Sequence, residues 1–214
     1  RESIFLHKNE NIENPPKNIK LPQNLFIVGT VNIDETTYMF SPKVLDRAGV
    51  MEFRMERKGF ESILDAVKAP TMQEIESTDE NNAKLFVSIA TKQSTNSKVI
   101  MNNKSTIIKL FELLKVIGAE FGYRTIIDIK RYAEMLSMLD ETAEDNFILD
   151  TAILQKLIPK LHGSRKKLEQ TLKQLVEFCK GDISDDILYP LSYEKLTRML
   201  KNLNDNGFVS FSEA

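Results

Sequence analysis

Apolar residues recur every three or four positions through most of the second half of the chain, and this spacing constrains the fold most strongly. Such spacing places the apolar side chains on one face of a helix, which must then be buried against other elements. Hydrophobic residues make up 42% of the 214 residues, which is enough for a sizeable core. The pattern predicts five amphipathic helices, in the windows 107–117, 126–136, 149–157, 168–179 and 193–203.

The first part of the chain has a different pattern. Residues 25–31 form a nearly continuous apolar run, which is typical of a strand buried on both faces of a parallel sheet. Residues 50–54 are a second candidate strand. Between them, Ser41 can cap a helix that has Pro42 at its first position and runs to Arg47. Two strands are not stable alone, so we expect the missing strands upstream of Arg1.

These patterns divide the chain into two predicted domains. Residues 1–57 have the features of the end of an α/β sheet domain, and residues 58–214 those of an all-helical domain. The fold class is therefore mostly α with a small α/β portion. Polar windows at 70–82 and 92–104 predict loops, and residues 208–211 predict a short strand after the last helix.

Composition excludes several classes of protein. With 29 basic and 31 acidic residues, the net charge of -2 gives no global reason to bind nucleic acid or a membrane. No apolar run approaches the ~18 residues of a membrane span, and the first residues, Arg1-Glu2-Ser3, do not have the pattern of a signal peptide. A single cysteine, Cys179, excludes an intrachain disulfide and fits a reducing cytoplasm. His7 and His162 are too few and too far apart to predict a metal site.

Three polar positions are candidates for chemistry on phosphates. Asn32 directly follows the predicted buried strand, at the edge where α/β sheets bind ligands. Arg47 follows Asp46 at the end of the short helix, and a planar guanidinium suits a phosphoryl group in transfer. Arg124 opens a predicted helix, where a cation opposes the helix dipole unless an anion binds nearby. Each also has a plain structural interpretation. Asn32 could simply cap the following turn. Arg47 could be a surface residue paired with Asp46, and Arg124 an ordinary surface charge.

Taken together and in this order, these residues resemble a known family. The stretch 24–48 (NLFIVGTVNIDETTYMFSPKVLDRA) is similar to AAA+ motors of the McrB-like kind, the GTP- or ATP-driven subunits of modification-dependent restriction systems. Later segments resemble the same family, and the resemblance spans most of residues 21–211. These segments are FGYR at 121–124, LIPKLHGSR at 157–165 and KLTRML at 195–200.

The resemblance implies a role for each candidate residue. Asn32 matches the sensor 1 position, which orients the attacking water or contacts the γ-phosphate. Arg47 matches the arginine finger presented to the nucleotide of a neighbouring subunit, with Asp46 positioning it. Arg124 matches sensor 2 in the helical lid, and Asp34 belongs to the same site or shapes the turn. Residues 1–57 would then be the C-terminal end of an AAA+ α/β core, and residues 58–214 the helical lid with further helices.

Two motifs of the family are missing. A phosphate-binding loop needs Gly-x-x-x-x-Gly-Lys-Ser/Thr, and no Gly-Lys pair occurs in the chain. An apolar strand ending in Asp-Glu, which holds Mg²⁺, is also absent, and both are expected upstream of Arg1. We therefore expect GTP or ATP with Mg²⁺ to bind the parent protein but not this chain alone, which would not be catalytic. The implied partners are identical subunits in a hexameric ring, a nuclease subunit, and DNA through the complex.

A second interpretation stays open, in which the chain is a non-enzymatic DNA-binding or protein-interaction module. The window 156–173 is the most basic in the chain and could contact DNA phosphates or form a solvated helix face. Residues 193–211 also have the pattern of a recognition helix and wing of a winged-helix protein. An amphipathic helix with a glycine stop explains that pattern equally well.

Overall fold

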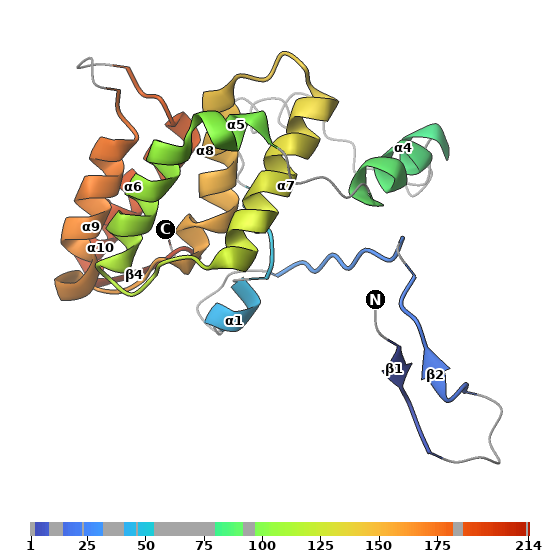
Figure 1. Ribbon diagram of the computed structural model, residues 1–214. Coiled ribbons are helices and arrows are strands. Elements are labelled where there is room, and N and C mark those ends of the chain that lie inside the picture. Colours follow the sequence, from blue (N-terminus) through green and yellow to red (C-terminus); the bar gives the residue numbers. More distant parts are fainter. Residues whose placement is uncertain are drawn as a thin grey trace, which may run out of the picture. The chain divides into compact units, whose positions relative to one another are not determined.

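The computed structural model describes residues 3–8, 15–22, 24–31, 41–45, 47–53, 80–91, 97–181, 186–212 and 214. These residues are mostly helical, with a few short strands (Figure 1). They belong to two compact units, which we describe separately. The first unit comprises the described parts of 1–32 and 70–93, and the second those of 33–69 and 94–214.

The first unit contains a small hairpin and one helix. Its elements are β1 (Ile4–Phe5), β2 (Asn18–Ile19) and α4 (Glu80–Thr91). The two strands are antiparallel, with Ile4 opposite Ile19. Phe26 packs edge-on against Phe86 of α4, with ring centroids 4.8 Å apart. This arrangement suits aromatic rings, whose positive edges are attracted to negative faces.

The second unit is a helical bundle with a two-stranded sheet (Figure 1). Its α-helices are α1 (Pro42–Leu45), α5 (Lys98–Asn102), α6 (Lys104–Lys115), α7 (Tyr123–Leu139), α8 (Asp145–Lys156), α9 (Arg165–Phe178) and α10 (Pro190–Asn206). The remaining elements are the 3-10 turn η1 (Ile158–Lys160) and the strands β3 (His162–Ser164) and β4 (Phe208–Ser210).

All five predicted amphipathic helices are confirmed as α6 to α10. Helix α10 packs against both α9 and α8, while α7 packs against α8 and α6 against α9. The predicted apolar faces meet in one core, and Cys179 is buried in it as expected of an apolar helical position. The best-buried side chains of this core include Leu110, Leu114, Ala133, Ile148, Leu149, Leu168, Leu172, Leu196, Met199 and Leu203.

A short antiparallel sheet closes one end of the α9–α10 pair. β3 directly precedes α9 and β4 directly follows α10, and Gly163 lies opposite Val209 in the register. Outside the sheet, the N–H of Arg165 donates to the carbonyl of Gly207 at 2.8 Å. The predicted strand at 208–211 is thus confirmed as β4, because β3 supplies the backbone partner that any strand needs.

The other two predicted strands are wrong within the described residues. Residues 24–31 pair with no strand, and Ile27 and Val28 are 88% and 85% exposed instead of buried on both faces. Residues 50–53 likewise form no strand. The reason is that an apolar run becomes a strand only where a neighbouring strand takes up its backbone hydrogen bonds.

Three local predictions have mixed outcomes. The helix beginning at Pro42 is confirmed as α1, but it ends at Leu45, and Arg47 lies in the turn that follows. The predicted loop at 92–104 is wrong in part because Ser97 caps α5, its hydroxyl accepting from the N–H of Ile100.

The predicted domain boundary at 57/58 falls outside the described residues and stays a prediction. In the described part of the chain, no helix is both long and apolar enough to cross a bilayer.

Candidate functional site around Arg47 and Arg124

The structure describes two of the five predicted site residues. Arg47 and Arg124 both lie in the second unit. Asn32, Asp34 and Asp46 lie outside the described residues, so their predicted roles stay predictions. The site can therefore be built only from the two arginines and the elements that hold them.

Arg47 is exposed in the turn that closes α1. The N–H groups of Arg47 and Ala48 both donate to the carbonyl of Val44 at 3.0 Å, which ends the helix in a tight turn. The carbonyl of Ser41 accepts from Val44 and Leu45 at the other end. A four-residue helix is marginal alone, and α1 is held by its packing against η1.

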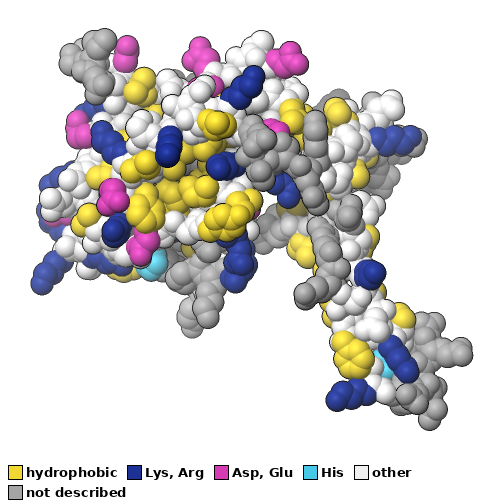
Figure 2. Space-filling model, in the orientation of Figure 1, with side chains coloured by type: hydrophobic (Ala, Val, Ile, Leu, Met, Phe, Trp, Pro, Cys, Tyr) yellow, Lys and Arg dark blue, Asp and Glu magenta, His cyan; other side chains and the backbone are white. Residues whose placement is uncertain are grey.

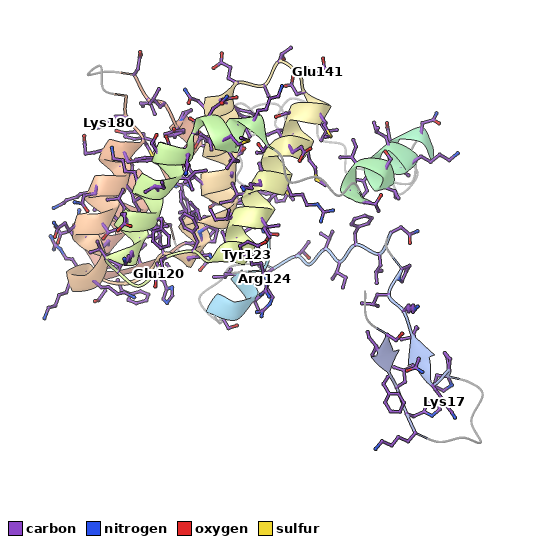
Figure 3. All side chains as sticks on the ribbon, viewed as in Figure 1. Lys17, Glu120, Tyr123, Arg124, Glu141 and Lys180 are labelled. Carbon is purple, nitrogen blue, oxygen red and sulfur yellow. The ribbon has the colours of Figure 1, made fainter. Side chains whose placement is uncertain are left out.

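Arg124 is exposed in the first turn of α7, beside Tyr123 (Figure 3). Gly122 is the N-cap of this helix, so no side chain caps the first N–H groups, and the first turn contains no acidic residue. Uncapped N–H groups carry the positive end of the helix dipole. With Arg124 added, this helix end favours an anion.

One lysine joins the turn of Arg47 to the helix of Arg124. The ammonium of Lys156, at the end of α8, donates to the carbonyl of Ala48 at 3.1 Å and to the Asp128 carboxylate at 3.2 Å. Ala48 adjoins Arg47 in sequence, and Asp128 lies one helical turn beyond Arg124 on α7. Because the Lys156 side chain is only 15% exposed, solvent screens these contacts less than it would at the surface.

The turn η1 strengthens the same junction. Lys160 of η1 donates to the hydroxyl of Thr125 at 3.0 Å, and Thr125 follows Arg124 directly. Since α1 packs on η1 and Lys160 of η1 reaches α7, the turn η1 contacts both the short helix before Arg47 and the helix that carries Arg124. Figure 3 shows Arg124 at the end of α7 that lies near α1. The tertiary structure thus links the turn of Arg47 to the helix of Arg124, two segments that are far apart in the sequence.

Residues 47–53 lie along the bundle with alternate residues facing it. Residues 48, 50 and 52 are the anchors: the carbonyl of Ala48 accepts from Lys156, and the N–H of Val50 donates to the carbonyl of Gln155 at 3.3 Å. The carboxylate of Glu52 pairs with Lys195 at 3.0 Å and with Arg198 at 3.3 Å, both on α10. The residues between the anchors, Arg47 among them, are exposed; Glu52 as a whole residue is exposed too, although its side chain is only 22% exposed.

The basic window at 156–173 is neutralised in part within the protein, by Asp128 and Glu169. Besides Lys156 and Lys160, two further cations of the window, Arg165 and Lys173, hold Glu169 between them at 3.0 and 2.7 Å. Hydrogen bonds from Arg165 and then Lys173 lower the pKa of Glu169 to about 2. The face of α9 therefore offers less positive charge to nucleic acid than its sequence indicates.

Helix α10 does not present a basic face either. Its exposed charged positions, Glu194, Lys201 and Asp205, are of mixed sign. Lys195 is buried and Arg198 reaches both Glu52 and Glu194. The two cations that the winged-helix interpretation would direct at DNA are thus engaged with carboxylates of the chain.

Comparison with known protein families matched residues 74–208 to a domain of unknown function, DUF8727. The match covers more than half of the chain. The chain belongs to the DUF8727 family. Neither the curated proteins nor the solved structures contained a match to this chain. The DUF8727 segment includes Arg124 and Lys195, and it begins after Asn32 and Arg47.

Two buried charges in the DUF8727 segment escaped the sequence prediction. Asp150 of α8 is fully buried, and its two carboxylate oxygens accept from the N–H groups of Leu191 and Ser192 at 2.8 Å. It thereby caps the start of α10 from another helix. Lys195 lies in the apolar stripe of α10, just before Leu196. A charged residue within an apolar stripe was the one available signal for both.

The cysteine and histidine side chains outside this site do not form a second reactive site among the described residues. Burial, with Asp150 nearby, raises the pKa of the Cys179 thiol to about 12, so the thiolate form is scarce. Nδ1 of His162 donates to the carbonyl of Lys160 at 3.1 Å. In the residues that the structure describes, no group of three or more His, Cys, Asp or Glu side chains is placed to hold a metal ion.

Proposed function

We propose that this chain is the C-terminal part of an AAA+ nucleoside-triphosphatase similar to McrB-like motors, with Arg47 as arginine finger and Arg124 as sensor 2. The main support is the bridge from Lys156 to Ala48 and Asp128. The bridge makes the turn of Arg47 and the helix of Arg124 parts of one packed body. A nucleotide-driven movement of the helical part would therefore also move Arg47.

The environment of Arg47 suits a finger that acts on another subunit. Its turn is held by backbone hydrogen bonds and by the Lys156 contact at Ala48, while Arg47 itself is exposed. A guanidinium placed beside a transferring γ-phosphoryl group stabilises the charge that develops on its oxygens. Asp46 would position the arginine, and an identical subunit of a hexameric ring would supply the nucleotide.

The environment of Arg124 suits a nucleotide phosphate in its own subunit. The uncapped start of α7 and the exposed guanidinium act together on an anion. Asn32 would orient the attacking water, and Asp34 would support that site. When bound, Mg²⁺ would neutralise charge on the phosphates of GTP or ATP. Hydrolysis would drive DNA translocation and cleavage with a nuclease subunit.

Exposed apolar side chains also support a larger α/β core. Ile27 and Val28 in the first unit and Phe53 in the second are more than 80% exposed. Apolar side chains at such exposure are compatible with surfaces that other parts of a larger core would cover. The phosphate-binding loop and the Asp-Glu strand would belong to that core.

The finger assignment is tested in the intact nucleoside-triphosphatase. Arg47→Ala should lower turnover by about a thousandfold or more, because the charge on the transferring phosphoryl group loses its partner. Nucleotide binding, measured by calorimetry, should stay near the wild-type value. Arg165→Ala serves as a matched control, since Arg165 is an exposed arginine that pairs only with Glu169 among the contacts described. Unchanged turnover in Arg47→Ala would contradict the assignment.

DNA binding is the second candidate function, and only the order of the elements at the end of the chain favours it. The order β3, α9, α10, β4 with antiparallel pairing is compatible with the predicted recognition helix and wing. The engagement of Lys195 and Arg198 with carboxylates of the chain argues against it. Binding of the purified chain to duplex DNA with a steep salt dependence would favour this function over the motor.

A further inference from the structure

A buried lysine on α10 anchors the segment that carries Arg47. The Lys195 side chain is only 1% exposed, and its ammonium lies 3.0 Å from the Glu52 carboxylate. It also donates to the carbonyl of Ala214 at 2.6 Å and lies 4.1 Å from the centroid of the Phe211 ring. Burying an ammonium is unfavourable unless charged and polar partners compensate, and here they do.

The partner, Glu52, is the only acid in residues 47–53 and receives two cations from one face of α10. Lys195 and Arg198 are three positions apart on the helix, so their side chains project to the same side. Arg198 reaches Oε2 of Glu52 at 3.3 Å, the oxygen that also lies 3.0 Å from Lys195, while the ammonium of Lys195 donates to Oε1 at 3.1 Å. The Glu52 side chain is 22% exposed, so this three-residue cluster lies largely out of solvent.

The cluster sets the register of the segment on the bundle. Contacts alternate along 48, 50 and 52, so a shift by one residue would exchange the inward and outward sets. Met51 or Phe53 would then meet the buried ammonium of Lys195, and the charge would lose its carboxylate. A buried ion pair of this kind adds little to the free energy of unfolding. Its main effect is to disfavour the shifted arrangement, so that residues 47–53 keep one register on the bundle.

From this geometry we infer that Lys195 and Glu52 form a positioning latch, which locks residues 47–53 to α10 so that Arg47 faces outward at a fixed place. Helix α10 packs on α8 and α9 and is capped by Asp150, so the latch is attached to the best-packed part of the bundle. The consequence for Arg47 rests on the proposed function. The latch itself is a property of this chain.

The latch is tested on the chain without nucleotide, by amide hydrogen exchange. Glu52→Gln removes the charge from the partly exposed partner and leaves the core intact. Exchange in residues 48–53, where Val50 donates to Gln155, should become about tenfold faster while the rest of the bundle keeps its protection. Glu194→Gln is the matched control, because it removes an exposed partner of Arg198 and leaves Lys195 and Glu52 in place.

A second pair of variants changes the other half of the latch. Lys195→Met fits the apolar stripe and should also release residues 48–53, whereas Lys201→Met on the exposed side of α10 should not. Unchanged exchange in both Glu52→Gln and Lys195→Met would overturn the latch. Faster exchange spread evenly over the bundle would also overturn it, since it would mean a general loss of stability.

The link to Arg47 is tested separately in the intact enzyme. Glu52→Gln should lower kcat by about tenfold with KM little changed, because a displaced finger affects the transition state more than substrate binding. Glu194→Gln should leave both parameters unchanged. Faster local exchange with an unchanged kcat would overturn this link. The assignment of Arg47 as arginine finger would then depend only on the result for Arg47→Ala.

Discussion

At the scale of single residues, the charges that matter most are buried ones. Asp150 accepts two backbone hydrogen bonds from the first turn of α10, and the hydroxyl of Ser192 returns one to the carbonyl of Asp150 at 3.2 Å. Caps normally come from the residue that begins the helix. Here Tyr189 is the N-cap and makes no side-chain cap, so α8 supplies the acceptor.

Removing this acceptor should destabilise the chain. Asp150→Ala leaves the N–H groups of Leu191 and Ser192 without their acceptor, and we expect a loss of about 2–3 kcal/mol in the free energy of unfolding. Asp150→Asn should cost less, because one amide oxygen remains as an acceptor. Urea unfolding measures both, with Asp205→Ala as an exposed control that should change stability by less than about 0.5 kcal/mol. Equal stability of Asp150→Ala and the control would refute the cross-helix cap.

At the scale of elements, two glycines set how α9 and α10 join the β3–β4 sheet. Gly207 ends α10 in the left-handed conformation, with φ of +74°. Gly163 in β3 has φ of +147°, which residues with a side chain rarely adopt. A methyl group at Gly207 would meet open space, whereas at Gly163 it would lie 3.3 Å from Cδ of Lys167 and 3.6 Å from Cγ of Leu168.

These surroundings predict an order of effects. Gly207→Ala should cost about 1 kcal/mol of stability, since only the backbone conformation opposes it. Gly163→Ala should cost more, up to about 3 kcal/mol, because φ of +147° strains any residue with a side chain and Cδ of Lys167 must also move aside. Gly122→Ala is a suitable control, because Gly122 has a negative φ and open space around it. Chemical unfolding of the three variants gives the order, and a reversal between Gly163 and Gly207 would contradict it.

At the scale of the whole molecule, the described chain has an anion-favouring helix end but no phosphate-binding loop. Arg124 and the start of α7 would contact a nucleotide from one side only. Tight nucleotide binding needs the backbone cradle of a glycine-rich loop, and no Gly-Lys pair is present for it. The helical part thus has the features of a component that responds to a nucleotide held elsewhere.

We therefore expect the purified chain to bind neither GTP nor ATP at micromolar concentration. Isothermal calorimetry with Mg²⁺ measures this directly. If the chain does bind, Arg124→Ala shows whether the start of α7 is responsible. Micromolar binding that survives Arg124→Ala would reveal a phosphate site that neither the sequence motifs nor the described residues account for.

Much of the helical fold could be predicted because its signal is local. The spacing of Leu168, Leu172 and Leu175 depends only on the 3.6-residue turn, and α9 forms where the spacing places it. The apolar run at 25–31 gave a wrong strand prediction for the opposite reason. A strand needs backbone partners from elsewhere, and composition carries no information on whether they are present.

The candidate site divides in the same way. The sequence by itself determined the five helices, the position of Arg124 at a helix start and the start of a short helix at Pro42, because each follows from neighbouring residues. Only the tertiary structure decided that Lys156 ties the turn of Arg47 to α7, that Asp150 caps α10, and that Lys195 meets Glu52 across 143 positions. A buried charge selects its partner by proximity in space, and chain folding alone creates that proximity.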